Sequence, residues 1–89
     1  MIVPNQIRAA RALLNIGQVE LAKRASLAIS TIKRIEAGRD EVRGAADTFI
    51  RIQQALEEAG VIFINADESA GPGVRLRGPT LSKWSSSLD

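Results

Sequence analysis

Residues 18–38, QVELAKRASLAISTIKRIEAG, restrict the possible fold more than any other part of the chain. Their apolar residues are Val19, Leu21, Ala22 and Ala25 in the first half and Ile29, Ile32 and Ile35 in the second. Both halves have the spacing of an amphipathic helix. The break between them, residues 26–28, has the length of a tight turn. The sequence therefore predicts two short helices that meet at a turn, the second beginning near Ala28 or Ile29 and ending at Ala37.

A further helix is expected on each side of this stretch. The first should run from a cap at Asn5 to about Asn15 and end at Gly17, which can adopt a left-handed conformation. Its buried stripe consists of Ile7, Ala10, Leu13 and Leu14. The last helix should run from residue 45 or 46 to residue 59 and end at Gly60. Its buried face consists of Phe49, Ile52, Ala55 and Leu56. Residues 1–4 are expected to form an extended arm.

The positive charge of the chain is concentrated in its first half. Residues 1–43 contain eight Arg or Lys and four Asp or Glu, hence +4, whereas residues 44–89 contain four and six, hence −2. A basic face favours nucleic acid because it attracts phosphates and releases their counterions. The alternative is an ordinary solvated surface, and charge alone does not decide between the two.

Several residues of the two short helices stand at the spacing of a known family. They are Gln18, Leu21-Ala22, Thr31-Ile32 and Arg34-Ile35-Glu36, followed by Gly38-Arg39. Through them, residues 5–60 resemble the Xre-like, or lambda-repressor-like, helix-turn-helix proteins, which include phage repressors and Cro. The resemblance implies a mainly α fold with a four- to five-helix domain over residues 1–60. It also implies that the helix over residues 28–37 enters the major groove of double-stranded DNA.

The same resemblance implies roles for individual residues. Contacts with base edges are implied for Ile29, Ser30, Thr31, Lys33 and Arg34. Gln18 is implied to contact a phosphate and to orient the recognition helix, and Arg11 is implied to form an ion pair with Glu36. For Ile29 the alternatives are contact with a thymine methyl group and burial in the core. In the loop after Gly38, Arg39 and Arg43 are either phosphate contacts or solvated side chains.

The sequence departs from the family pattern at two positions. The turn position often held by glycine is Ser26, and the recognition-helix cap often held by serine or threonine is Ala28. The methyl side chain of Ala28 cannot accept a hydrogen bond from the amides exposed in the first helical turn. These departures bear on where the recognition helix starts more than on the fold.

A short β-hairpin is expected over residues 61–77. Val61-Ile62-Phe63-Ile64 is an apolar, β-rich run, residues 65–73 are dense in turn residues, and residues 74–77 alternate apolar and basic. We interpret Gly71-Pro72-Gly73 as a turn and not as a phosphate-binding loop, because no strand-to-helix context surrounds it.

The hairpin predicts a homodimer. A lone hairpin is marginally stable in water, and a first strand that is apolar at four consecutive positions needs cover on both faces. The long helix can supply part of this cover, and a second copy of the hairpin can supply the rest, by strand pairing or by sheet packing. The dimer contacts predicted in this way are Val61, Ile62, Phe63, Ile64, Val74 and Leu76. Arg75 and Arg77 share one strand face and either touch phosphate or keep an edge soluble.

Residues 78–89 are predicted to form a flexible tail, because they are rich in serine and other polar residues. Trp84 is the only large anchor in this segment. It is either exposed, docked on the dimer or part of a partner-binding segment.

The composition argues against several other classes of protein. The chain has no cysteine and no histidine, so disulfides, thiolate metal sites and histidine bases are excluded, and we expect neither a metal site nor a cofactor. The serines lack a histidine to activate them and the carboxylates are not paired, so we do not expect an enzyme. The first ten residues lack the features of a signal peptide, and no run approaches the roughly 20 apolar residues of a membrane span. A cytoplasmic protein without membrane contact is therefore expected.

These expectations lead to a hypothesis for the function. The chain would be a transcriptional regulator of bacterial or phage type that binds double-stranded DNA sequence-specifically, as a dimer on a pseudo-palindromic operator. The alternative is an antitoxin or anti-activator that uses the same scaffold mainly to bind a protein partner. A steep fall of DNA affinity with salt would favour the regulator, and a co-purifying stoichiometric partner would favour the alternative.

Overall fold

The computed structural model describes residues 1–38 and 46–78 of the 89-residue chain. The described residues contain four helices and two strands, namely α1 (Pro4–Leu14), α2 (Gln18–Ala25), α3 (Ile29–Glu36), α4 (Ala46–Glu58), β1 (Val61–Ile64) and β2 (Gly73–Leu76). The two strands pair antiparallel. A mainly helical domain followed by a short hairpin is thus confirmed, at this coarse level. None of the described helices is long and apolar enough to cross a lipid bilayer.

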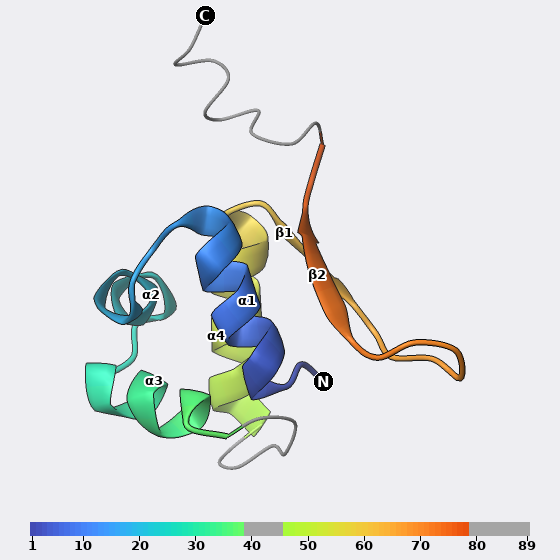
Figure 1. The fold of residues 1–89 in the computed structure, drawn as a ribbon. Helices are drawn as coiled ribbons and strands as arrows, with labels where there is room; N and C mark the ends of the chain where they lie inside the picture. The colour runs from blue at the N-terminus through green and yellow to red at the C-terminus, as the bar shows by residue number, and fades with distance from the viewer. Residues whose placement is uncertain (39–45, 79–89) are drawn as a thin grey trace, which may run out of the picture.

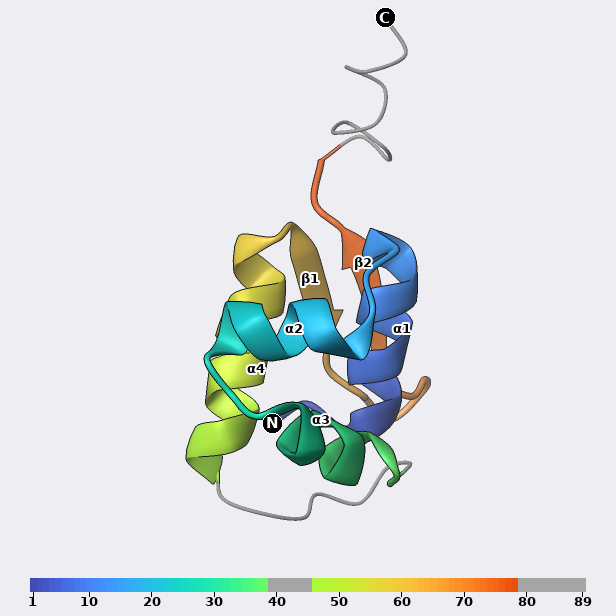
Figure 2. The same cartoon turned by 90° about the vertical axis from the view of Figure 1, so that its left-hand side faces the viewer.

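Helices α1 and α4 separate the other elements into two groups. The helices α2 and α3 lie on one side of them and the hairpin lies on the other (Figure 1). In the turned view, α2 and α3 are in front and the hairpin is behind (Figure 2). Strand β2 packs against α1 and strand β1 against α4, while α2 contacts α4 and α3 contacts α1. The hairpin and α3 are therefore on opposite sides of one domain.

The core is built from the apolar stripes of all four helices. Its largest fully buried aliphatic and aromatic side chains are Ile7, Leu21, Ile32, Phe49, Ile52 and Leu56. Each such side chain stabilises the folded state by about 1.5 to 3 kcal/mol relative to exposure. Ile2 is also buried, at 3% exposure, and belongs to the same core. The extended arm expected at residues 1–4 is therefore only partly right: Met1 is exposed and Val3 is extended, but Ile2 and Pro4 are buried and helix α1 begins at Pro4.

The start of α1 differs from the prediction of an Asn5 cap. The residue before the helix is Val3, and Pro4 occupies the first helical position, where its missing N–H is not needed. The backbone N–H of Val3 donates to Gln6 Oε1 at 2.9 Å. Asn5 lies inside the first turn, and its Oδ1 accepts a hydrogen bond from Arg8. Gln6 therefore bonds back to the residue before the helix, and the side-chain cap that the sequence pattern assigned to Asn5 is not formed.

The end of α1 also differs in detail. Asn15 has the left-handed conformation, with φ 57°, and its N–H donates to the last carbonyls of the helix. Gly17 is extended and precedes α2. Asparagine tolerates the left-handed region better than most residues, so the turn does not need the glycine that was predicted to provide it.

The register of the hairpin divides its side chains into two faces. Val61 pairs with Leu76 and Phe63 pairs with Val74, and these side chains pack against the core. The alternate pairs, Ile62 with Arg75 and Ile64 with Gly73, lie on the opposite face because side chains alternate along a strand. Beyond the strands, the N–H of Arg77 donates to the carbonyl of Gly60 at 2.7 Å.

One buried polar side chain connects the hairpin to the helices. Gln6 is 4% exposed, and its Nε2 donates to the carbonyls of Ile64, at 3.1 Å, and Gly73, at 3.0 Å. These two residues face each other where the hairpin leaves the helical part. Gln6 therefore fixes the outer end of the strands to the first turn of α1.

Candidate functional site

The turn between α2 and α3 is closed by backbone hydrogen bonds. Ser26 has φ 57° and ψ 46°, the left-handed conformation that usually favours glycine. The N–H of Leu27 donates to the carbonyl of Ala22 at 2.9 Å, which folds the chain back after α2. Ala28 then precedes α3 in an extended conformation, without a side-chain cap. Ser26 thus adopts the left-handed conformation at the position where the resemblance led us to expect glycine, and α3 begins at Ile29.

Helix α3 has a buried side and an exposed side. Ile32, Ile35 and Glu36 are 0%, 3% and 5% exposed and face the core. Ser30, Lys33 and Arg34 are exposed. Among the described residues, their side chains have no hydrogen-bond or ion-pair partner. Helix α3 therefore presents a hydroxyl and two cations that the rest of the described domain does not use.

The other two predicted base-contact residues lie at the margin of this surface. Ile29 is partly buried and packs against the core cluster. Thr31 is also half-buried. Ile29 therefore packs partly against the core, and only the rest of its side chain is accessible for another contact.

Arg11 and Glu36 form the ion pair that the resemblance implied. Arg11 Nε donates to Glu36 Oε2 at 2.8 Å, and Nη2 donates to Oε1 at 2.7 Å. A third donor of Arg11, Nη1, reaches the carbonyl of Ile16 at 3.2 Å. The hydrogen bonds that Arg11 donates to the Glu36 carboxylate raise the pKa of Arg11, and the guanidinium stays charged at any relevant pH. This two-point contact holds α1 against the C-terminal end of α3.

Gln18 belongs to the same cluster. Its Nε2 donates to Glu36 Oε1 at 3.1 Å, although Gln18 opens α2 and Glu36 closes α3. Gln18 thus connects the beginning of α2 with the end of α3. Its predicted phosphate contact remains a prediction.

Arg8 makes a contact that sequence reasoning missed. Its Nη1 donates to the carbonyls of Glu36 and Gly38, the second at 2.7 Å, and its Nη2 donates to Asn5 Oδ1. The last carbonyls of a helix lack partners within the helix, and cations near this end are favourable. Arg8 therefore caps α3 from α1. The available signal was its separation of three residues from Arg11, which places both arginines on one side of α1.

Replacing Arg8 with Met should reveal this cap. Methionine keeps the apolar stem but removes the donors, so we expect the free energy of unfolding to fall by about 1 to 2 kcal/mol, measured by urea denaturation. The control is Arg24→Met, which loses only an exposed pair with Glu20 and should cost about 0.5 kcal/mol or less. Equal losses in the two variants would contradict the capping role.

The remaining predicted site residues lie elsewhere. Arg39 and Arg43 lie outside the described residues. Arg75 and Arg77 belong to the hairpin, on the opposite side of the domain from α3 (Figure 1). Within one copy, they therefore do not add to the surface of Ser30, Lys33 and Arg34.

The predicted dimer contacts divide between the two faces of the hairpin. Four of them pack against the chain's own core, namely Val61, Phe63, Val74 and Leu76. The other two, Ile62 and Ile64, lie on the opposite face.

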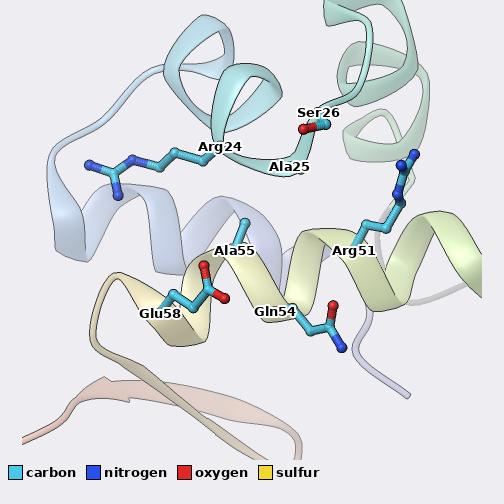
Figure 3. A pocket seen from close by; sticks show the side chains of 7 residues that line it. All are labelled: Arg24, Ala25, Ser26, Arg51, Gln54, Ala55 and Glu58. Atoms are coloured by element: carbon cyan, nitrogen blue, oxygen red, sulfur yellow. The ribbon is translucent and has the colours of Figure 1, made fainter.

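A polar groove lies between α2 and α4. Figure 3 shows Arg24 and Arg51 pointing away from each other there, with Glu58 on α4 at the end of the groove nearer Arg24. Arg24 is already paired with Glu20. The two arginines therefore do not converge on a common anion. Nor does the part of the chain that the structure describes contain a group of acidic side chains that could hold a metal ion.

No family model matches this chain, and a search of curated proteins finds no significant match.

Proposed function

We propose that this chain is a helix-turn-helix transcriptional regulator that binds double-stranded DNA as a dimer. Helices α2 and α3 would form the DNA-binding unit, with α3 in the major groove. An α-helix fits this groove, and hydroxyl and cationic side chains can hydrogen-bond to base edges within it. In a dimer, two α3 helices about 34 Å apart would meet successive major grooves on one face of the DNA.

One observation carries this proposal. Ser30, Lys33 and Arg34 project from one side of a helix whose other side is buried, and they have no partner within the described domain. A helix with two cations on its surface is common. Here, however, Arg8, Arg11 and Gln18 also hold the end of the helix. These contacts hold the last turn of α3, which carries Lys33 and Arg34, in place before binding, and ordering it on binding would otherwise weaken affinity.

The proposal is tested by DNA binding measured over a range of salt. The DNA upstream of the chain's own gene is titrated with the protein by fluorescence anisotropy, beside a scrambled sequence of equal length. Each phosphate contact should contribute about 0.9 to the slope of log affinity against log salt. Equal affinity for both sequences, with no region protected in footprinting of the upstream DNA, would contradict sequence-specific binding there.

Arg34→Ala should weaken specific binding by about 1 to 3 kcal/mol for each half-site, because one base contact is lost. The matched control is Arg24→Ala, which removes the same charge from the exposed C-terminal turn of α2. Both variants are compared on specific and scrambled DNA at one salt concentration. If the two variants lose affinity equally on both sequences, Arg34 acts only through its charge and the base contact is refuted.

A further inference from the structure

The face of the hairpin turned away from the core is unusual in its combination of side chains. It carries Ile62, Ile64 and Arg75, and the exposed Arg77 follows directly after β2, where its Nη2 also donates to the carbonyl of Glu57 at 3.3 Å. We call these four residues the outer hairpin face. Ile64 is 41% exposed, one of the few large apolar side chains exposed to this degree in the described residues. An apolar centre beside two arginines points to a partner with both apolar and acidic groups.

The hairpin itself supplies the acidic groups, at its other end. Asp67 and Glu68 lie at the exposed tip, which projects away from the helices (Figure 1). Asp67 Oδ1 accepts hydrogen bonds from Ser69 N at 2.8 Å and Ala70 N at 2.9 Å, and these bonds lower the pKa of Asp67. Among the described residues, neither Glu68 nor Arg75 has an ion-pair partner. Opposite charges thus occupy opposite ends of one hairpin, where they cannot pair within a single copy.

In a dimer with two-fold symmetry, the acidic end of one hairpin can lie against the basic end of the other. Ile64 is the last residue of β1, so Asp67 and Glu68 lie beyond it at the turn, whereas Gly60 and Arg77, joined by a backbone hydrogen bond, lie at the other end of the hairpin. If two hairpins lie antiparallel with Ile64 against its own copy, the acidic turn of each copy lies toward the arginine end of the other. At the same time, Arg75 approaches the turn of the second copy near Asp67. The apolar contact lies at the centre and the charges at the rim, as in stable protein interfaces.

We infer that a second copy of this chain covers the outer hairpin face, with the two hairpins antiparallel about Ile64 and the acidic tip of each against the arginines of the other. This inference deepens the proposed function, since it names the surface through which the proposed DNA-binding dimer forms. A second copy fits because the surface is complementary to itself under a two-fold rotation, as an isologous interface requires. Short hairpins bury less than a standard interface of about 1,600 Å², so the dimer is expected to be weak.

The test is sedimentation velocity of the intact chain without DNA, at several micromolar concentrations and low salt. The wild type forms dimers, and Arg77→Glu and Glu68→Arg each weaken dimerisation by about tenfold or more, because each change occurs twice in the dimer. The double variant with both changes restores dimerisation, because the charges are exchanged. Ile64→Ser also weakens the dimer. Arg51→Glu, an exposed reversal on α4, leaves it unchanged.

Circular dichroism confirms that each variant keeps its helices. A wild type that stays monomeric over the whole concentration range overturns the inference. A double variant no better than either single variant, or an Ile64→Ser variant that dimerises normally, overturns it as well. Because no DNA is present, such a result does not bear on the DNA titration, which judges the proposed function separately.

Discussion

Glu36→Ala should lower the free energy of unfolding by about 3 to 5 kcal/mol. Glu36 is 5% exposed and accepts hydrogen bonds from Arg11 and Gln18. A buried pair contributes little net stability, because desolvating both charges offsets their attraction. Removing the carboxylate alone, however, leaves the Arg11 guanidinium partly buried without its counter-charge, and that state is costly. The loss should appear in urea denaturation with an unchanged dependence on urea concentration.

A double variant separates this explanation from simple loss of packing. Arg11→Met combined with Glu36→Leu removes both charges and keeps apolar volume, so it should be more stable than Glu36→Ala alone. If the free energy of unfolding of Glu36→Ala stays within about 1 kcal/mol of the wild-type value, the unpaired Arg11 charge does not destabilise the fold as predicted. If the double variant is as unstable as the single one, lost packing explains the effect.

Gln6→Ala should have the next largest effect on stability, about 2 to 3 kcal/mol. The change removes a buried donor from the carbonyls of Ile64 and Gly73 and the acceptor of the Val3 N–H. Buried polar groups that lose their partners cost about 1 to 3 kcal/mol each, although the hairpin can relax and recover part of the loss. The control is Gln54→Ala, at an exposed position on α4.

The part of the domain that loses stability in Gln6→Ala distinguishes Gln6 from an ordinary core residue. In the Gln6→Ala variant, hydrogen exchange should become faster for the hairpin amides of Ile62 and Arg75. This should happen at urea concentrations at which the amides of helix α2 keep their protection. Uniformly faster exchange throughout the domain would show that Gln6 supports the whole core and does not specifically hold the hairpin.

Apolar spacing predicted the elements of this domain well. The repeat of Ile29, Ile32 and Ile35 placed α3 to within a residue of its observed bounds, because these positions face one core. The same method failed for polar side chains that bond across the fold. Gln6 and Arg8 look like ordinary polar positions of α1, yet their partners lie far along the chain, at Gly73 and Gly38. Local periodicity carries no information about such partners.

In the candidate site too, helix periodicity predicts which side chains are exposed but not which contacts they make across the fold. The exposure of Ser30, Lys33 and Arg34 follows from the helix period alone. The position of Ile29 does not, because a residue at the margin of a helix stripe turns inward or outward according to its neighbours. The contacts of these residues with DNA remain predictions, and the Arg34 titration tests one of them.

Within the described residues, helix α3 is held by hydrogen bonds from side chains of other helices at its C-terminal end only. Its C-terminal end is fastened by Arg8, Arg11 and Gln18, whereas its N-terminal end at Ala28 has no side-chain cap. Fraying of α3 should therefore begin in its first turn, next to Ser30, while the last turn stays docked. A helix anchored in this way can adjust its leading residues to the local shape of a surface without the domain losing its hold on it.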